Sequence, residues 1–437
     1  MSFHYYLEQL GCAKNQVDGE LMLSCLDGAG WIRQLQPEDA DLLIVNSCAF
    51  IESAKLESIN TMLTFRKRFP QKKIILSGCL AQRYASELSK SMPEADAFLG
   101  VDDITKIHEL AHSLFKDSPV NAARNSENNY GGRPLLSLPG QAYIKIAEGC
   151  NNHCSFCAIP SIRGRLRSRS IDDIYSEFND LVFRGIKEIC FVAQDLASYG
   201  VDIAGKCLLD DLLCAISNIK GDFWIRLLYL HPDHFPLSIL NTIKKDSRIL
   251  PYFDIPFQHA SQPVLYAMNR SGTAAIYLEL VKAIRAAMPD SFIRSTFLTG
   301  FPGETDADFN ALLAFQKAAQ IDWLGVFTYS REEETSAFDM KGRVSKKTAA
   351  LRKSTLEEKQ ISITEKRLER LVGRHLTALV EEVVDEEEGL YLGRLYCQAP
   401  EVDGAAVIES GKKLEPGSFV QGKITGRAGF DLRVDLF

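Results

Sequence analysis

The chain has 437 residues, of which 46% are hydrophobic and 24% are charged, and its formal net charge is −7 at pH 7. This composition is typical of globular enzymes and excludes collagen, a coiled coil or disorder as the main state. At roughly 150 residues per domain the length predicts about three domains, and the negative charge argues against a general nucleic-acid binder.

The first 116 residues alternate short apolar runs with helical stretches. The runs HYYLEQL, DLLIVNS, KKIILSG and AFLG each precede a segment of 3.6-residue period, which predicts an N-terminal parallel α/β domain over 1–116. Residues 117–140 are rich in Asn, Ser, Gly and Pro, which is typical of a linker between domains.

From 141 to 340 the alternation of strands and helices resumes. Six candidate strands, AYIKIAEG, KEICFVAQ, FWIRLLYL, YFDIPFQ, FIRSTFLTG and WLGVFTYS, predict a (β/α)6-type barrel, closed or partial. Residues 341–372 are charged with sparse apolar positions and predict a solvated connecting helix. Short alternating runs over 373–437 predict a small antiparallel β-barrel.

No apolar run reaches the roughly 18 residues of a membrane span, and the first residues lack the pattern of a signal peptide. We therefore expect a cytoplasmic protein without a membrane partner. In that reducing compartment the eleven cysteines are not expected to form a disulfide framework. Metal ligation, catalysis or burial must account for them.

Three cysteines form a compact motif where the first strand of the barrel ends: Cys150, Cys154 and Cys157 in EGCNNHCSFCAIP, here called the barrel cysteines. Three thiolates in so short a loop can bind three irons of one 4Fe-4S cube and leave the fourth iron open. A zinc site is the alternative, and it would need a fourth ligand such as His153 or a distant cysteine.

A second set, here called the N-terminal cysteines, follows three successive strands: Cys12, Cys48 and Cys79. The carboxyl ends of parallel strands share one edge of a sheet, where ligands bind, so these thiols are expected to converge. Three separately buried cysteines are the alternative. The other five, Cys25, Cys190, Cys207, Cys214 and Cys397, fall inside predicted elements and are interpreted as core or surface residues.

The barrel cysteines have the spacing CxxxCxxC, with Phe156 just before the last cysteine, and this motif resembles that of the radical SAM superfamily. The resemblance implies that the open iron binds S-adenosylmethionine (SAM) and that one electron cleaves SAM to a 5′-deoxyadenosyl radical. Such chemistry needs a cluster at the low end of the potential range. A flavodoxin or ferredoxin-like electron donor is therefore implied.

The two cysteine sets together resemble the methylthiotransferases, in which a cluster domain, a radical SAM barrel and a C-terminal, OB-like TRAM domain follow one another. The resemblance covers almost the whole chain and implies two 4Fe-4S clusters and two SAM per product. GCAKNQVDGE, VNSCAFIESAKLESI, CSFCAIPSIRGRLRSR and QAPEVDG resemble the RimO-type branch, which modifies small-subunit ribosomal protein S twelve. Gly19 and Glu334 depart from that pattern, where Ser and Gly are expected.

The resemblance implies that the target is the β-carbon of an aspartate in S twelve, free or in the ribosomal subunit. Residues 373–437 carry twelve acidic and seven basic side chains, a net charge of about −5, which suits a basic protein better than RNA. No direct tRNA substrate is therefore expected. A MiaB-type enzyme acting on tRNA adenosines and a non-enzymatic metal-binding scaffold that docks on the ribosome are the alternatives.

Beyond the cluster ligands no catalytic side chain is predicted. By family resemblance and by their places at strand ends, five residues are predicted to bind SAM: Phe156, Gln194, Arg226, Gly300 and Glu304. Burial or ion pairing is the alternative for Gln194, Asp195 and Arg226, and a plain turn for the GFPGET segment. Four arginines after the cluster loop could contact substrate or SAM, with salt bridges or capping as the alternative: Arg163, Arg165, Arg167 and Arg169.

Overall fold

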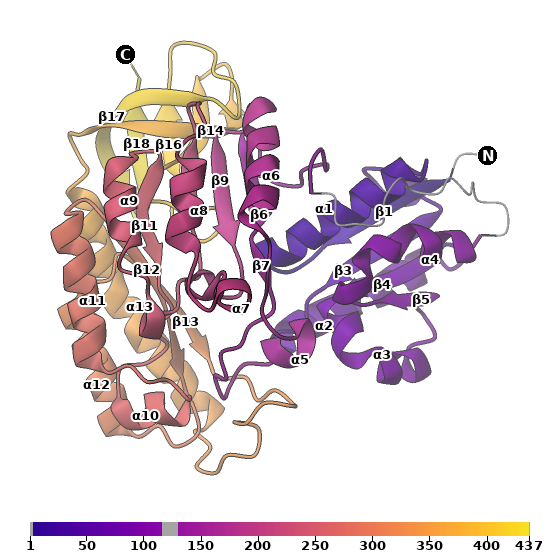
Figure 1. Cartoon of the computed structure of the whole chain (residues 1–437), viewed down its shortest axis with the longest axis horizontal. Coiled ribbons are helices and arrows are strands. Elements are labelled where there is room, and N and C mark those ends of the chain that lie inside the picture. Colours follow the sequence, from indigo (N-terminus) through magenta and orange to yellow (C-terminus); the bar gives the residue numbers. More distant parts are fainter. Residues whose placement is uncertain (1–2, 116–129, 437) are drawn as a thin grey trace.

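The computed structural model describes residues 3–115 and 130–436, which form three groups of elements (Figure 1). An N-terminal sheet with its helices lies beside a larger central sheet, and a small barrel covers one end of the central sheet. Within the described residues, no helix combines the length and the apolar character that a membrane crossing requires.

The N-terminal sheet is parallel, with the strand order β2-β1-β3-β4-β5. Every residue of β3, LLIVNS, is buried, as expected for a parallel strand with helices on both faces. The predicted α/β fold is confirmed, although β2 is too short to show a hydrophobic period. The strands are β1 (His4–Gln9), β2 (Ile32–Arg33), β3 (Leu42–Ser47), β4 (Lys73–Gly78) and β5 (Ala97–Leu99), and the helices are α1 (Ala13–Gly28), α2 (Glu52–Arg68), α3 (Cys79–Ser91) and α4 (Ile107–Ser113).

The central sheet has six parallel strands in the order β13-β12-β11-β10-β9-β6. Since β6 and β13 are its two edges, the barrel is partial. The strands are β6 (Gln141–Lys145), β9 (Glu188–Val192), β10 (Trp224–Leu227), β11 (Ile249–Asp254), β12 (Phe292–Thr299) and β13 (Trp323–Thr328). The longer helices between them are α6 (Ile171–Phe183), α8 (Leu209–Ile216), α9 (Ile239–Lys245), α11 (Ala274–Ala287) and α12 (Asp306–Ala319), and the shorter ones are α5 (Ile159–Arg163), α7 (Val201–Ala204) and α10 (Gln262–Ala267).

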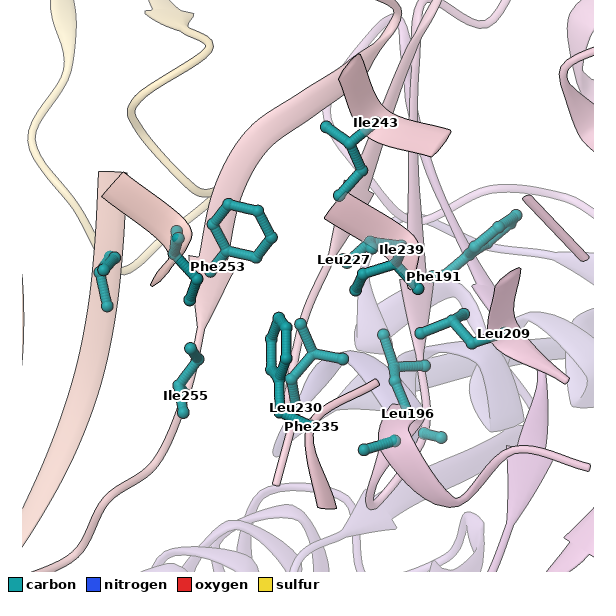
Figure 2. Packing of buried hydrophobic residues seen from close by; sticks show 14 of the residues in the cluster. Phe191, Leu196, Leu209, Leu227, Leu230, Phe235, Ile239, Ile243, Phe253 and Ile255 are labelled. Atoms are coloured by element: carbon teal, nitrogen blue, oxygen red, sulfur yellow. The ribbon is translucent and has the colours of Figure 1, made fainter. Parts of the chain in front are cut away.

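The main core lies between this sheet and its outer helices. Phe191, Leu227 and Phe253 project from neighbouring strands toward Leu209 of α8 and Ile239 of α9 (Figure 2). All are essentially inaccessible to solvent, and burying each such side chain contributes about 1.5–3 kcal/mol. This packing holds the strands in the register that sets their carboxyl ends.

The helix expected to be solvated is packed instead. α13 (Lys346–Glu369) lies against β13, and it buries a stripe of three apolar and three polar side chains at three- and four-residue spacing: Ala349, Arg352, Leu356, Gln360, Thr364 and Leu368. Gln360 and Thr364 donate to the carbonyls of Ile321 and Asp322 at 2.8 and 2.7 Å. The sparse apolar positions of the segment concealed this face because half of its buried side chains are polar and are satisfied by hydrogen bonds.

The C-terminal unit is a closed five-stranded barrel in the order β14-β15-β16-β18-β17. Its strands are β14 (His375–Asp385), β15 (Leu390–Leu395), β16 (Ala406–Glu409), β17 (Phe419–Ala428) and β18 (Asp431–Asp435). The barrel is antiparallel as predicted, except that β16 and β18 pair in parallel.

This barrel docks on the amino ends of the central strands. The Trp323 indole, at the start of β13, donates to the carbonyl of Cys397 at 2.7 Å. Glu188, the first residue of β9, is fully buried and pairs with Arg394 of β15. The carboxyl ends of the central strands therefore stay free of the C-terminal unit.

The described part of the predicted linker, residues 130–140, packs against both sheets. Residues 117–129 lie outside the described residues, and 130–140 contain neither helix nor strand. Arg133 is nevertheless fully buried and pairs with Glu20 of α1, at 2.8 Å, and with Glu177 of α6. This segment thus ties the N-terminal sheet to the central one.

Candidate active site

The barrel cysteines lie in a loop between β7 (Ala147–Glu148) and α5, just past the carboxyl end of β6. Gly149 has a φ of +73°, and a Cβ there would lie 2.1 Å from the carbonyl oxygen of Arg165, so the loop requires glycine to turn back on itself. Ser155 fixes the middle of the loop, since its hydroxyl donates to the carbonyl of Ala267 at 2.7 Å.

Two of the barrel cysteines lie in surroundings that favour the protonated thiol. Burial raises the pKa of Cys150 to about 11 and that of Cys157 to about 12. The Cys154 sulfur lies 4.0 Å from Nε2 of His231. Iron binding would have to displace these protons, because thiolates are the ligands that clusters require.

The N-terminal cysteines lie just beyond three adjacent strands of the other sheet. Cys12 precedes α1, Cys48 follows β3, and Cys79 opens α3. Burial raises the pKa of Cys79 to about 12, while Cys12 remains accessible to solvent. The surrounding protein acts to raise the pKa of Cys12, but Lys14 and Arg163 outweigh it and lower the pKa.

Each set supplies three thiols, the number of protein ligands that a 4Fe-4S cube with one open iron requires. Among the described residues, no three His, Cys, Asp or Glu side chains are placed to hold one metal ion together. Three thiolates that each bind a different iron of a cube do not have to converge on a single point. In both sets the cysteines lie close enough to influence one another's ionisation.

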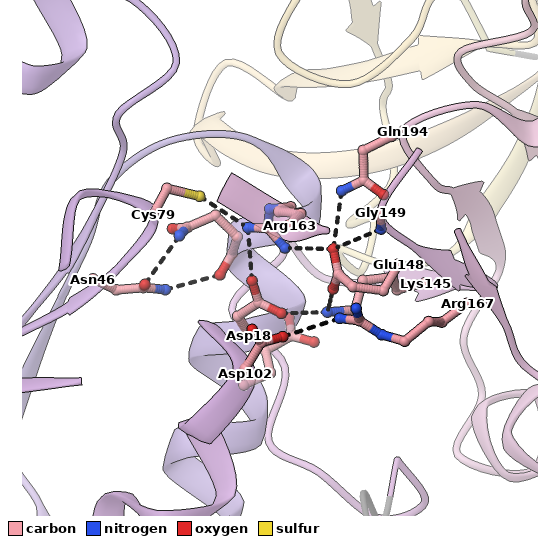
Figure 3. A network of polar contacts seen from close by, with 12 residues as sticks. Asp18, Asn46, Cys79, Asp102, Lys145, Glu148, Gly149, Arg163, Arg167 and Gln194 are labelled. Atoms are coloured by element: carbon pink, nitrogen blue, oxygen red, sulfur yellow. Dashed lines mark hydrogen bonds and ion pairs between the residues drawn. The ribbon is translucent and has the colours of Figure 1, made fainter. Parts of the chain in front are cut away.

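Arg163 connects the two cysteine sets (Figure 3). Its guanidinium lies 3.1 Å from the sulfur of Cys79, and it donates to Asp18 of α1 at 2.9 Å and to Glu148 at 3.0 Å. Glu148 stands two residues before Cys150. A buried network of charges therefore runs from the barrel loop to an N-terminal cysteine.

The other arginines of this segment show the salt-bridge alternative. Arg167 pairs with Asp102 at 3.0 Å, and Arg169 pairs with Asp173 and Glu177, each at 2.6 Å. Arg165 is exposed. Direct contacts of these side chains with SAM or substrate stay predictions.

A second contact between the two units lies beside Cys48. Glu332, in the segment after β13, is buried and pairs with Lys55 at 2.8 Å and with Arg83 at 2.9 Å. Arg83 also donates to the carbonyl of Ala49 at 3.1 Å. The Cys48 loop is thereby held against the central unit.

Two of the residues predicted to bind SAM belong to the cysteine loop or contact its start: Phe156 lies within the loop, and Gln194 lies against Glu148. The Gln194 amide donates to Glu148 at 3.0 Å, and its own oxygen is buried without a partner among the described residues. Phe156 packs on the buried cluster that contains Met268 and Phe301. Their predicted role as SAM contacts is compatible with these positions.

Gly300 and Glu304 have structural tasks in the GFPGET turn. Gly300 has a φ of +77°, and a Cβ there would lie 2.4 Å from that of Ala349 in α13. The buried Glu304 carboxylate accepts from the amides of Gly300 and Phe301 and pairs with Arg352 at 3.2 Å. Their side chains close the turn and seat α13, and SAM binding by either residue stays a prediction.

The prediction that Arg226 contacts SAM is wrong. Its guanidinium is fully buried, pairs with Glu188 at 2.6 Å and donates to the carbonyl of Tyr396 in the C-terminal unit at 2.8 Å. The strand-end position suggested a ligand contact, but the side chain points toward the amino end of the sheet. Ion pairing, the alternative from the sequence, is what the structure contains.

Other residues near the cysteines were not predicted as a group. Asp195 accepts from Asn152 of the cysteine loop at 2.8 Å and from His234 at 2.6 Å. Burial acts to raise the pKa of Asp195, but His234 outweighs it and the pKa falls to about 2. His231 and His234 follow β10, so their positions after a barrel strand could have identified them.

The two departures from the family pattern lie in different units, Gly19 in α1 and Glu334 after β13. Glu334 has a φ of +61°, in the left-handed region that favours glycine, which explains why glycine is expected there. A Cβ at Gly19 would lie 2.3 Å from Oε1 of Gln9. A serine there would therefore need the flexible Gln9 side chain to move.

Comparisons with known proteins match all three units. Family models match as "Uncharacterized protein family UPF0004" over 4–100, "Radical SAM superfamily" over 144–315 and "TRAM domain" over 372–436. A curated relative, "Ribosomal protein uS12 methylthiotransferase RimO" of Treponema denticola, is 45% identical and covers 97% of this chain and 98% of its own. The protein of the same name from Carboxydothermus hydrogenoformans is 40% identical over 98% of both chains.

The fold also resembles solved radical SAM structures. The radical S-adenosylmethionine methyltransferase TsrM from Kitasatospora setae aligns with a TM-score of 0.56 over 77% of this chain and 74% of its own, at 14% identity. At that identity the likeness concerns the fold alone.

Proposed function

Because the chain belongs to the radical SAM family of ribosomal protein uS12 methylthiotransferases, we propose that it inserts a methylthio group at the β-carbon of an aspartate in uS12, small-subunit protein S twelve. The uS12 protein could be modified free or within the ribosomal subunit. Two SAM molecules would be used for each product.

The six cysteines supply the ligands for two 4Fe-4S clusters in this proposal. The barrel cysteines would hold the cluster that binds SAM, which supplies one-electron cleavage of SAM when reduced. The N-terminal cysteines would hold the second cluster, at which sulfur is handled. Phe156, within the barrel loop, and Gln194, beside its start, would contact SAM.

One observation carries the proposal: the 3.1 Å contact between Arg163, which follows the barrel cysteines, and the sulfur of Cys79. It links the helix that follows the barrel cysteines directly to a candidate ligand of the second cluster, as expected if both clusters serve one reaction. Two unrelated structural clusters would not require this arrangement.

The acidic surface of the C-terminal unit and the need for electrons indicate two protein partners. The hairpin tip between β14 and β15 carries Glu386, Glu387 and Glu388, all exposed, and such an acidic surface would attract a basic ribosomal protein. A flavodoxin or ferredoxin-like protein would supply the electrons. We place the reaction in the cytoplasm, where ribosomes and such donors occur together.

Deleting the gene tests the proposed substrate. Peptide mass spectrometry should show loss of the methylthio increment from uS12, and nucleoside analysis of the same cells should show unchanged methylthio-adenosines in tRNA. Loss of the tRNA modification alone, with uS12 unaffected, would reject the uS12 assignment in favour of tRNA.

A further inference from the structure

Lys14 lies at the junction of the two units, and its ammonium makes no hydrogen bond or ion pair among the described residues. It stands two residues after Cys12, on the first turn of α1, and is only partly buried. Its ammonium lies 3.4 Å from the centre of the Tyr229 ring, which belongs to the loop after β10. Lys14 therefore projects from the N-terminal cysteines toward the carboxyl ends of the central strands.

The aromatic ring is the principal partner of this ammonium. Within residues 3–115 and 130–436, no hydrogen-bond acceptor or carboxylate reaches Lys14 within bonding distance. A ring face attracts the charge but cannot accept three N–H bonds. Among the nearby buried charges, Arg163 pairs with Asp18 and Glu148, and Arg294 pairs with Asp403. The buried Asp254 carboxylate also acts on Lys14 from a longer range; it accepts from the Tyr229 amide and lies beyond ion-pair distance of the ammonium.

Tyr229 is held firmly in place for this contact. Its φ is +68°, a conformation that a bulky residue adopts only where the surrounding structure enforces it. Its amide donates to Asp254 at 3.3 Å, and its carbonyl accepts from Leu196 at 2.9 Å. The ring consequently positions the ammonium and leaves its N–H groups available.

A carboxylate matches this site in charge and in geometry. It would accept charge-assisted hydrogen bonds from the ammonium, which are stronger than those between neutral groups. Cys12 is accessible to solvent beside it, so an entering anion would come to rest next to the N-terminal cysteines. A neutral amide of the same shape would lose most of the attraction.

We propose that the Lys14 ammonium binds the side-chain carboxylate of the target aspartate and thereby selects aspartate over asparagine. This inference rests on the proposed function and names the residue that recognises its substrate. The carboxylate carbon of aspartate is bonded directly to the β-carbon, so fixing the carboxylate also fixes the carbon that receives the methylthio group. Lys14 is thus a specificity-determining residue.

The test compares the binding affinities of two substrate forms for the wild-type enzyme and for a Lys14 variant. Recombinant uS12 with aspartate or with asparagine at the modified position is titrated anaerobically against reconstituted wild-type enzyme and against the Lys14→Met variant. Methionine is unbranched and of similar length but uncharged. We expect the wild type to bind the aspartate form about 10- to 100-fold more tightly, as charged hydrogen bonds allow, and the Lys14→Met variant to bind both forms about equally.

Two further variants control for charge and for folding. Lys14→Arg keeps the charge and should retain most of the discrimination. Lys67→Met removes a lysine from the exposed face of α2 in the same unit and should discriminate as the wild type does. Iron content and reductive SAM cleavage, measured on every variant, report whether the clusters are intact.

The outcomes separate this inference from the proposed function. If wild-type enzyme methylthiolates uS12 yet binds both substrate forms alike, or if Lys14→Met still discriminates, Lys14 does not read the carboxylate although the proposed function stands. A Lys14→Met variant that discriminates normally but needs more SAM would assign the lysine to the cofactor and overturn the inference. Failure of wild-type enzyme to modify uS12 at all would reject both.

Discussion

Removing the Arg163 guanidinium should destabilise the protein because the charges around it are buried. Its side chain is 2% exposed and that of Asp18 is 0% exposed, at a separation of 2.9 Å. Removing one partner of a buried ion pair costs about 3–5 kcal/mol. Lys145 still faces both Asp18 and Glu148, so the loss in free energy of unfolding for Arg163→Met should be near the lower end of this range, at about 3 kcal/mol.

Arg167→Met is a matched control on the same segment. Arg167 also joins the central unit to the N-terminal one, through Asp102 at 3.0 Å, but both side chains are 53% exposed. An exposed pair of this kind contributes about 0–1 kcal/mol. The two variants share the chemical change and differ in burial.

Urea unfolding of anaerobically reconstituted protein, matched for iron content, measures the difference. The midpoint and the slope of each transition yield the free energy of unfolding. We expect Arg163→Met to lose at least about 2 kcal/mol more than Arg167→Met. Equal losses would refute the argument that burial makes the Arg163 network stabilising.

Replacing all three barrel cysteines by alanine should leave one 4Fe-4S cluster, seen by iron and sulfide analysis and by Mössbauer spectra; a protein without any cluster would remove the assigned role of the N-terminal set. Cys48→Ala should still cleave SAM reductively but yield no methylthio product, and full methylthiolation would contradict sulfur handling at that set. Reversing the charge of Glu386, Glu387 and Glu388 to Lys should weaken uS12 binding most at low salt, because exposed charges are screened as salt rises, while SAM cleavage is unchanged. Burial acts to raise the pKa of Glu188, but Arg394 and Arg226 outweigh it and hold the pKa below the ordinary 4.5. The charged Glu188 therefore stabilises the fold above pH 4.5, and this stabilisation is lost as the pH falls through the lower folded pKa. Glu188→Gln should lower the free energy of unfolding at pH 7 by about 3–5 kcal/mol, and in acid denaturation the difference from wild type should shrink as the pH falls.

The sequence was sufficient for the features that depend on local patterns. β1, β3, β4 and the six central strands arise from apolar runs that are visible in the sequence. The rule that parallel strands end at one edge predicted where both cysteine sets would lie. Cysteine spacing and order along the chain were therefore enough to indicate the family.

Contacts between distant segments were decided by the tertiary structure. Arg226 appeared to be a pocket residue because it lies near the end of a strand, yet it pairs with Glu188 and reaches Tyr396, 170 residues along the chain. α13 appeared solvated because half of its buried face is polar, with partners such as the carbonyls of Ile321 and Asp322 just before β13. Spacing along the chain cannot reveal such partners.

What the sequence determined by itself is which residue types stand at the ends of which strands, because the periods of two and 3.6 residues are properties of the local backbone. Only the tertiary structure decided that Lys14 faces Tyr229 and that Arg163 reaches Cys79. Both contacts join the two sheets, and their geometry depends on how the N-terminal unit docks on the central one. That docking is fixed by buried charges such as Asp18, Arg133 and Glu332, whose pairing is long-range and leaves no periodic signal in the chain.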